Sequence, residues 1–456
     1  MHYYSTNKKS EPVSLSDAVL KGLAADGGLY MPEYIPVFDP SFFTAFRGMD
    51  LPEIGTHVVS AFLSEDVPED VLSEMVTDTL DFDIPLVEVE PHIYSLELFH
   101  GPTMAFKDVG ARFMSRLMAY LHRISTKEGK TSTGRGGGAY DADRRPLKVV
   151  VATSGDTGSA VAAGFYNVPG IEVYVLFPRG KVSPLQQKQI TTWGGNVHAL
   201  EVDGTFDDCQ RLAKAVLADK KLREQYLLTS ANSINIARLI PQSIYYFYAA
   251  AQVGDPSLPL VFSVPSGNFG NLTAGLLAYR MGLPIKQFIA ATNRNDVVPQ
   301  YADSGVYRPR PSLQTISNAM DVGDPSNFVR MMEFFNNDHH AFCSAIYTCA
   351  FTDQHTLDVI KEVVDRTGYL MDPHGAVAYM GARMFLSAWK RPTNMVFLET
   401  VHPAKFAGAI ESVVGEVTLP PQLKAVQDKP EQFVSIGNDV EALTQILHNG
   451  SGSLSS

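Results

Sequence analysis

Short apolar runs alternate along the middle of the chain with segments in which apolar residues recur every three or four positions. The runs predict buried strands, and the helical spacing predicts helices between them. Strands that alternate with helices in this way indicate parallel sheets covered by helices, with ligands at the carboxyl ends of the strands. The predicted strands span 148–152, 171–177, 197–202, 260–264 and 285–291, and the predicted helices span 158–166, 183–190, 206–217 and 272–280.

A mostly helical pattern precedes this alternation. Residues 13–24 predict a capped amphipathic helix, and further helical patterns follow between about 40 and 82. Turn residues at 81–85 mark a boundary. We therefore predict an α/β protein with a smaller, mostly helical N-terminal domain, 1–82, and a larger domain, 83–456, built from two α/β subdomains.

Two segments lack such periodicity. Residues 127–146 are rich in glycine and polar residues, which predicts a flexible surface insertion, with a functional lid as the alternative. The tail from about 436, which ends in Gly-Ser-Gly-Ser-Leu-Ser-Ser, is predicted to fray.

The segment 97–124 contains an unusual lysine. A short apolar strand ends in the turn His100-Gly-Pro-Thr, and helical spacing of apolar residues begins near Lys107. The positive end of the helix dipole repels an ammonium at this position. That repulsion and the apolar neighbours at 104–106 favour the neutral, nucleophilic form of the amine. A surface lysine at a helix start is the alternative interpretation.

Two loops, at Ser154 and Ser266, share the pattern Ser-Gly-[Asp/Asn]-x-Gly. Each lies between a predicted strand and a helix start, where glycines allow close approach and backbone N–H groups hold an anion. At equivalent positions in one sheet, they predict two anionic groups held side by side. Neither loop is GxGxxG and no Walker lysine pattern occurs, which disfavours nucleotides. A lone activated lysine with two anion sites fits pyridoxal phosphate.

Composition narrows the class of protein. Of the 456 residues, 45% are hydrophobic and 19% are charged, which is typical of a globular enzyme. The net charge of −12 disfavours nucleic acid and anionic membranes as partners. Three cysteines without CxxC or metal spacing predict no metal site and a reducing compartment. Neither an apolar leader nor a long apolar run occurs, so we expect a cytoplasmic protein.

Seven longer motifs occur in order along the chain. They are Glu97-Leu-Phe-His-Gly-Pro-Thr-Met-Ala-Phe-Lys107-Asp, Ala152-Thr-Ser-Gly-Asp-Thr-Gly, Phe177-Pro-Arg-Gly-Lys181-Val-Ser-Pro-Leu-Gln, Ser230-Ala-Asn-Ser-Ile-Asn-Ile-Ala-Arg238, Val264-Pro-Ser-Gly-Asn-Phe-Gly, Ser317-Asn-Ala-Met-Asp and Glu399-Thr-Val-His-Pro-Ala-Lys405-Phe. In these motifs, between Val13 and about residue 420, the chain resembles the threonine synthase family of the pyridoxal-phosphate fold-type II superfamily. The resemblance implies a tryptophan synthase β-like fold of parallel-type sheets flanked by helices.

The resemblance also implies residue roles around the cofactor. Lys107 is the Schiff-base lysine and the catalytic residue. Thr400 places a hydroxyl against the pyridine nitrogen and leaves that nitrogen largely unprotonated. The residues that cradle the cofactor phosphate in this family correspond to Gly267, Asn268, Phe269 and Asn271.

The substrate residues are expected in other motifs. Ser154 and Thr157 match the loop that holds the substrate carboxylate. Asp156 between them would repel that carboxylate, so we expect it to serve the helix or the loop backbone. For the substrate phosphate we predict a cluster that contains an arginine, because a guanidinium presents paired donors that match a phosphate. A lysine is the second candidate, and the alternative is that this lysine is a solvated cation on a loop. These residues are Asn232, Ser233 and Arg238, and the lysine is Lys181. His374 and Lys405, which also lie near family motifs, are expected to be structural.

The implied reaction converts O-phospho-L-homoserine and water to L-threonine and phosphate, by γ-elimination and β-addition with pyridoxal 5'-phosphate. This is the last step of threonine biosynthesis, carried out by a monomer or homodimer on a small-molecule substrate. A related phospho-lyase that releases 2-ketobutyrate would share every motif. A non-catalytic homologue that keeps the fold is the second alternative.

Overall fold

The structure is a computed structural model that describes residues 1–128 and 145–449. The chain forms two compact units. The first unit comprises Met1–Glu33, Gly110–Arg238 and Gln422–Ser456, and the second comprises Tyr34–Val109 and Leu239–Pro421. Both units draw on both predicted domains, so the bounds 1–82 and 83–456 stay a prediction. The predicted insertion at 127–146 falls mainly on 129–144, outside the described residues.

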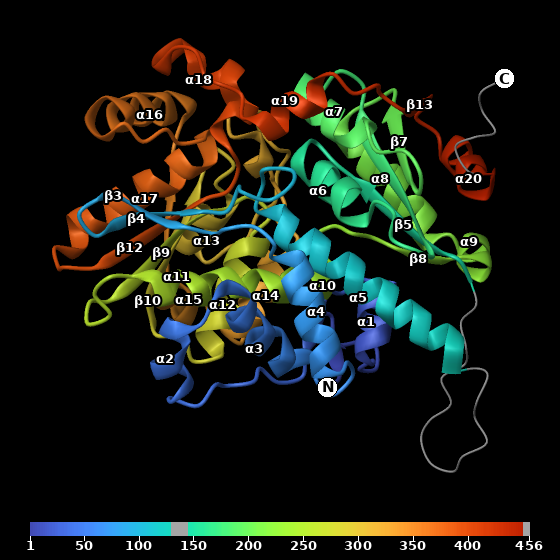
Figure 1. The fold of residues 1–456 in the computed structure, drawn as a ribbon, viewed down its shortest axis with the longest axis horizontal. Helices are drawn as coiled ribbons and strands as arrows, with labels where there is room; N and C mark the ends of the chain where they lie inside the picture. The colour runs from blue at the N-terminus through green and yellow to red at the C-terminus, as the bar shows by residue number, and fades with distance from the viewer. Residues whose placement is uncertain (129–144, 450–456) are drawn as a thin grey trace. The chain divides into compact units, whose positions relative to one another are not determined.

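A five-stranded sheet forms the centre of the first unit (Figure 1). All of its strand pairs are parallel, in the order β13 (Phe433–Ile436), β7 (Val197–Val202), β6 (Ile171–Pro178), β5 (Leu147–Ala152) and β8 (Leu227–Thr229). Its helices are α5 (Lys107–Glu128, which begins in the second unit), α6 (Asp156–Phe165), α7 (Pro184–Thr191), α8 (Phe206–Ala218), α9 (Lys220–Gln225) and α20 (Val440–Asn449). The alternation predicted between residues 148 and 217 is therefore confirmed.

Side-chain alternation along β6 explains how helices cover both faces of this sheet. Tyr174 and Leu176 pack on one face with residues of α8 and α20. Val175 points to the opposite face and lies against α6, where a Cβ added to Gly158 would be 3.0 Å from Val175 Cγ1. The glycine therefore lets α6 lie close to the sheet.

The expected fraying beyond about residue 436 is wrong for the described part of the tail. After β13, helix α20 buries Leu443, Ile446 and Leu447 against the sheet. The buried Lys148 of β5 donates a hydrogen bond from Nζ to the carbonyl oxygen of Leu447. The i, i+3, i+4 spacing of the three apolar residues is the helix signal that the polar end of the chain obscured.

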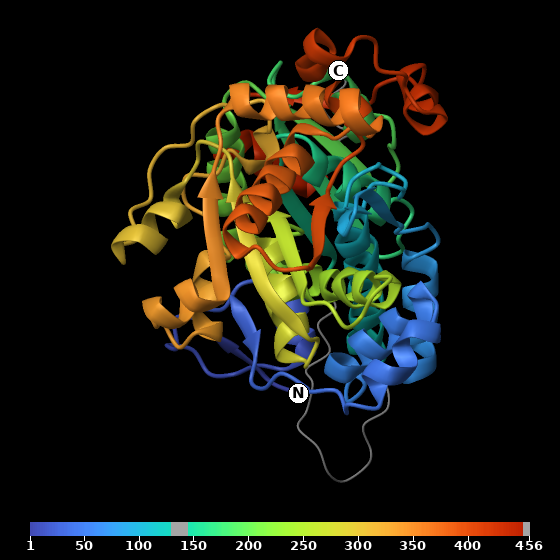
Figure 2. The same cartoon turned by 90° about the vertical axis from the view of Figure 1, so that its left-hand side faces the viewer.

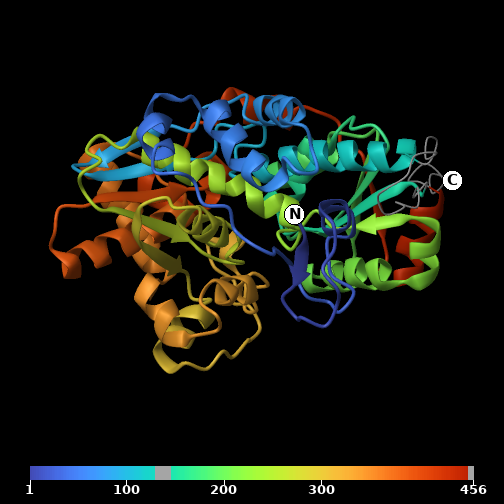
Figure 3. The same ribbon diagram turned by 90° about the horizontal axis from the view of Figure 1, so that it is seen from below.

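The N-terminal part of the first unit is small. Strands β1 (Tyr3–Ser5) and β2 (Tyr30–Pro32) pair antiparallel, beside the N label in Figure 3. Between them lies α1 (Leu15–Lys21), and the Ser14 side chain caps it by accepting from the backbone N–H of Asp17. This confirms the predicted capped helix.

A six-stranded sheet forms the centre of the second unit, with strands β9, β10 and β12 visible in Figure 2. Its order is β11 (Ile346–Ala350), β10 (Ile285–Thr292), β9 (Leu260–Pro265), β12 (Asn394–Glu399), β4 (Ile93–Glu97) and β3 (Leu86–Glu90). The pairs are parallel except for β3, which is antiparallel to β4. The two Ser-Gly-[Asp/Asn]-x-Gly loops follow β5 and β9, so the expectation that they share one sheet is wrong.

Helices cover both faces of this second sheet. Phe262 of β9 contacts Tyr246 of α11 edge-on at 4.9 Å between ring centroids, while its neighbour Ser263 donates from Oγ to the carbonyl oxygen of Ala378 in α17, at 2.6 Å. The helical elements of the second unit are α2 (Phe42–Ala45), η1 (Phe46–Gly48), α3 (Leu51–Leu63), α4 (Glu69–Thr79), η2 (Ile240–Ser243), α11 (Ile244–Gln252), α12 (Gly270–Arg280), α13 (Val297–Ser304), η3 (Asn318–Met320), α14 (Phe328–Phe334), α15 (His339–Ala345), α16 (Asp353–Thr367), α17 (Pro373–Trp389), η4 (Pro403–Phe406) and α18 (Ala407–Val414). Helices α10 (Ile236–Leu239) and α19 (Pro421–Gln427) cross the unit bounds. Among the described residues, every helix is too short or too polar to serve as a membrane span.

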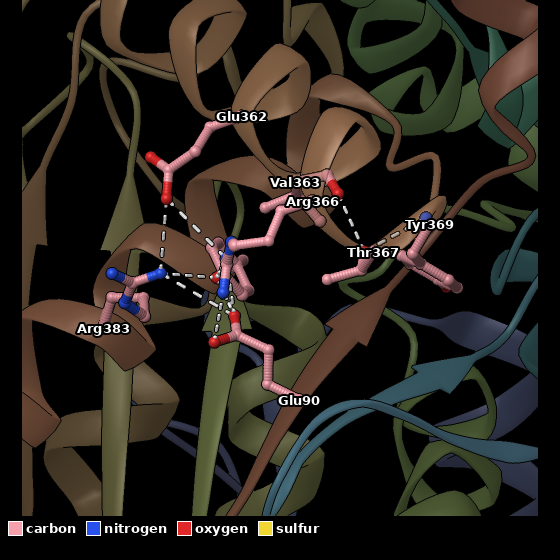
Figure 4. Close-up of polar contacts among 8 residues, drawn as sticks. Glu90, Glu362, Val363, Arg366, Thr367, Tyr369 and Arg383 are labelled. Carbon is pink, nitrogen blue, oxygen red and sulfur yellow. Dashed lines mark hydrogen bonds and ion pairs between the residues drawn. The ribbon is translucent and has the colours of Figure 1, made fainter.

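A polar cluster ties the edge strand β3 to α16 and α17 (Figure 4). Arg366 donates two hydrogen bonds to the Glu90 carboxylate, at 2.7 and 2.9 Å, and a third to the hydroxyl of Tyr379. The Tyr379 hydroxyl also donates to Glu90. The Arg366 fork is the main cause that holds the pKa of the Glu90 carboxyl below its usual range.

We predict that Arg366→Lys lowers the free energy of unfolding by about 1 kcal/mol at pH 7, because lysine cannot make the paired hydrogen bonds. Since the pKa of folded Glu90 is lowered, the difference from the unaltered chain is complete above pH 4.5 and shrinks as the pH falls below it. Urea titrations at several pH values measure this. The control is Lys361→Ala, which breaks an exposed ion pair with Asp365 on the same helix. Equal losses for both variants would contradict the prediction.

Candidate active site

Three neighbouring strands of the second unit bring together Lys107, Thr400 and the loop 266–271. The loop follows β9, Thr400 follows β12, and the turn that leads to Lys107 follows β4. These strands are adjacent and parallel, so their carboxyl ends lie at one edge of the sheet. This is the edge where sheets of this kind bind ligands.

The backbone fixes the turn before Lys107 against the segment that carries Thr400. The N–H of Phe106 donates to the carbonyl oxygen of Thr400 at 2.8 Å, and Ala105 forms an antiparallel bridge with Val401. Helix α5 begins at Lys107, as the apolar spacing predicts. The Lys107 amine lies 5.0 Å from the centroid of the Phe106 ring.

Asp108 supports this turn from inside the protein. It is fully buried, and its carboxylate accepts the backbone N–H of Thr103 at 2.9 Å and the Thr103 hydroxyl at 2.6 Å. The buried Lys405 donates from Nζ to the carbonyl oxygen of Thr103 at 3.0 Å. A Cβ on Gly101 would lie 2.6 Å from Asp108 Oδ2, so only glycine leaves room here. The sequence alone assigns no role to Asp108, because its contacts with Thr103 depend on the conformation of the turn.

The loop 266–271 is shaped for a close approach to its backbone. Phe269 has a left-handed conformation, φ 61°, and precedes the first residue of α12. The first N–H groups of a helix have no acceptor within the helix, so they can hold an anion. Asn271 fixes the loop, because its Nδ2 donates to the carbonyl oxygen of Pro265 at 2.9 Å. Asn268 Oδ1 accepts from the backbone and the hydroxyl of Ser326 at 2.7 and 2.8 Å.

A buried acid lies next to Thr400. Thr400 is 6% exposed, and the preceding Glu399 is completely buried. Glu399 accepts the backbone N–H of Asp372, the residue that caps α17. Burial, followed by the nearby charge of Asp372, raises the pKa of the Glu399 carboxyl well above its usual range. Burial therefore disfavours the negatively charged form of Glu399 beside Thr400.

In the first unit, three further loops follow neighbouring parallel strands. The segments after β8, β5 and β6 carry the residues predicted to bind substrate, and the order β6-β5-β8 places their carboxyl ends at one edge. Ser154 and Thr157 are half-buried after β5, and Asn232 and Ser233 are half-buried after β8. Lys181 after β6 is exposed.

Asp156 is buried and contacts a side chain of a neighbouring helix. It is 5% exposed, and its Oδ1 accepts from Nε2 of the buried Gln186 on α7 at 3.1 Å. Gln186 fits over Gly155, where an added Cβ would lie 2.4 Å from its Nε2. Asp156 does not cap α6, because the N-cap position belongs to Gly155, whose φ is 153°. The role of Gln186 had not been predicted, although it closes the motif that begins at Phe177.

Arg238 is buried, 3% exposed, and donates from Nη1 to the carbonyl oxygen of Ala231 at 2.6 Å. This hydrogen bond closes the segment that holds Asn232 and Ser233, so the three residues form one local cluster. The residues predicted to bind the substrate thus lie in the first unit, and those predicted to bind the cofactor lie in the second.

Family models cover most of the chain. The model described as pyridoxal-phosphate dependent enzyme matches residues 83–400, and models of the threonine synthase N terminus and C-terminal part match 2–80 and 375–447. The threonine synthase of Escherichia coli K12 is 40% identical over 451 residues, 98% of this chain and 100% of the relative. This chain belongs to the threonine synthase family.

Solved structures of threonine synthases agree with this membership. The Escherichia coli enzyme matches with a TM-score of 0.87 and 39% identity, over 98% of this chain and 100% of that one. The pyridoxal-phosphate-bound enzyme of Brucella melitensis matches with a TM-score of 0.88 and 36% identity, over 98% of both chains. Maize serine racemase, at 18% identity and a TM-score of 0.52 over 78% of this chain and 95% of that one, shares the fold. The predicted fold type and the cofactor, pyridoxal phosphate, are thereby confirmed.

The loop 266–271 fits the phosphate of that cofactor. A Cβ on Gly267 would lie 2.6 Å from Cα of Met320, so a side chain at this position would displace the loop or the facing backbone. The donors offered are backbone N–H groups at a helix start, which suit a phosphate.

We predict that Gly267→Ala weakens the affinity for pyridoxal phosphate by at least about tenfold, because the added methyl group displaces the loop. The matched control is Gly254→Ala in the same unit, where an added Cβ meets no atom within 4 Å. Titration of the cofactor-free chain, followed by absorbance, gives both dissociation constants. Unchanged affinity in Gly267→Ala would show that the phosphate lies elsewhere.

Proposed function

We propose that the chain converts O-phospho-L-homoserine and water to L-threonine and phosphate. The observation that carries the proposal is the placement of Lys107, Thr400 and the loop 266–271 at the ends of three adjacent parallel strands, in a member of the threonine synthase family. The bound cofactor supplies an electron sink for carbanion chemistry at the substrate.

The second unit holds the cofactor in this proposal. The backbone N–H groups at Gly267, Asn268, Phe269 and Asn271 would bind its phosphate, and Lys107 would hold its aldehyde. The Thr400 hydroxyl would face the ring nitrogen. A hydroxyl at this position, in place of a carboxylate, offers no anion to favour protonation of that nitrogen.

The first unit supplies the substrate groups. Ser154 and Thr157 orient the substrate carboxylate through hydroxyl and backbone donors at the start of α6. Arg238, with Asn232 and Ser233, binds the substrate phosphate, since a guanidinium matches phosphate geometry. Lys181, which is exposed, is the second candidate for this role.

Lys107 moves the protons. With the cofactor bound, its amine would take one proton from Cα and one from Cβ as general base. The Cγ–O bond breaks, and its electron pair leaves with phosphate, which takes up one proton from water. The hydroxide of that water adds at Cβ, and the lysine, as general acid, returns one proton to Cγ, which becomes the methyl group, and one to Cα. We also propose that the protein is a cytoplasmic monomer or homodimer. Its net charge of −12 disfavours nucleic acid and anionic membranes as partners.

We predict that Lys107→Ala loses turnover by at least about a thousandfold while the fold is kept, because the amine is needed for chemistry and a cation at a helix start does not stabilise the helix. Thermal unfolding and phosphate release measure the two effects. Lys214→Ala, on the exposed side of α8, is the control. Borohydride reduction of the unaltered chain should add the cofactor mass to the peptide that contains Lys107. A cofactor mass on another lysine would overturn the assignment.

Products distinguish the proposed reaction from its alternatives. Incubation of the cofactor-loaded chain with O-phospho-L-homoserine should release threonine and phosphate in equal amounts. Release of 2-ketobutyrate without threonine would instead identify a phospho-lyase. A chain that neither binds the cofactor nor releases phosphate would be a non-catalytic homologue.

A further inference from the structure

The wall that faces Gly267 comes from a separate segment of the second unit. Ala319 and Met320, in η3, lie so close that a Cβ on Gly267 would be 2.6 Å from Met320 Cα and 3.0 Å from the carbonyl oxygen of Ala319. The space around the loop 266–271 therefore depends on where the backbone at 319–320 is held.

Asp321 holds this segment on its C-terminal side. Its Oδ1 accepts from the Thr315 hydroxyl at 2.7 Å and from Asn293 Nδ2 at 3.0 Å, and its Oδ2 accepts the Thr315 N–H at 3.0 Å. Burial, which exceeds the opposing effect of these hydrogen bonds, raises the pKa of the Asp321 carboxyl to about 6. These bonds fix the chain directly after Met320.

His374 holds the same segment from α17. The N–H of Ala319 donates to His374 Nε2 at 3.2 Å, and His374 Nδ1 faces Asp372 Oδ1 within hydrogen-bond distance. Because Nε2 accepts, the neutral ring carries its proton on Nδ1 and donates it to Asp372. The ring is 1% exposed and packs edge-on against Phe406, with 4.9 Å between the centroids.

Asp372 is itself fixed, so the ring cannot turn freely. Its carboxylate accepts the backbone N–H groups of His374 and Gly375, at 2.7 and 3.3 Å, as the cap of α17. Its own backbone N–H donates to Glu399, the residue before Thr400. A series of hydrogen bonds thus leads from the strand end at Glu399 to the wall at Ala319.

We propose that His374 is a positioning residue for the cofactor phosphate. Its Nε2 holds Ala319 and Met320 against Gly267, and thereby sets the shape of the loop that binds the phosphate. This inference rests on the proposed function, which assigns the phosphate to that loop. It gives His374 a role in binding, where the sequence indicates a structural one.

Two substitutions separate the two ring nitrogens. In His374→Gln the amide oxygen can reach the position of Nε2 and accept from Ala319, whereas His374→Asn keeps a donor toward Asp372 and leaves Ala319 N–H without its acceptor. The full-length, cofactor-free chain is titrated with pyridoxal phosphate and with pyridoxal, which lacks the phosphate. We expect His374→Asn to bind pyridoxal phosphate roughly tenfold more weakly and pyridoxal with unchanged affinity. His374→Gln should restore most of the preference for the phosphate.

The control is His339→Gln on α15, whose Nε2 hydrogen-bonds the carbonyl oxygens of Tyr301 and Ala302 at 3.1 and 2.9 Å. It should leave both affinities unchanged. Equal weakening of both ligands in His374→Asn, or unchanged binding, would overturn the inference. The product assay tests the reaction separately: a chain that shows the expected binding pattern yet releases 2-ketobutyrate would refute the proposed reaction and leave the role of His374 supported.

Discussion

The parallel pairing of β12 between β4 and β9 is the constraint on which the candidate site depends. Its register aligns Glu399 with Glu97, so the chain leaves β12 and β4 at the same level. The Phe106 N–H then reaches the carbonyl oxygen of Thr400, and α5 begins one residue later. A lysine on a flexible loop would lose orientation; here hydrogen bonds to a central strand fix its backbone.

Buried polar groups support this arrangement, and their surroundings differ. Asp108 is stabilised by donors from Thr103, and Lys405 donates to the carbonyl oxygen of the same threonine. At Glu399, burial next to Asp372 raises the pKa of the carboxyl, which disfavours its ionised form.

Local patterns predicted much of the fold. Helix starts at Lys107 and after Ser14, and strands at 148–152 and 260–264, depend on apolar spacing and turn residues close in the sequence. The assignment of the two anion loops to two sheets could not be predicted, because strand order follows pairing between distant segments such as 93–97 and 394–399.

Side-chain roles were predicted less well than strands, for the same reason. Gln186 of α7 lies against Gly155 because α7 packs beside α6. His374 accepts the N–H of Ala319, which lies 55 positions away in the sequence. Neither contact has a signal in the local sequence. The motifs that contain Gln186, Gly155 and Ala319 nevertheless pointed to the family, although the sequence does not show which contacts these residues make.

The two anion loops have the same local pattern, yet their surroundings differ in a way that suits different ligands. The loop at Ser266 is held by Asn271 and Ser326 and faces the fixed backbone at Met320. The loop at Ser154 has Gln186 behind it, while Ser154 and Thr157 themselves stay half-buried. A rigid cradle suits a cofactor phosphate that stays through many turnovers, because little entropy is then lost on binding. A more open loop suits a substrate that must enter and a product that must leave. In the proposed function, the same helix-start chemistry serves a permanent anion at one loop and a transient anion at the other, and the side chains around each loop make the difference.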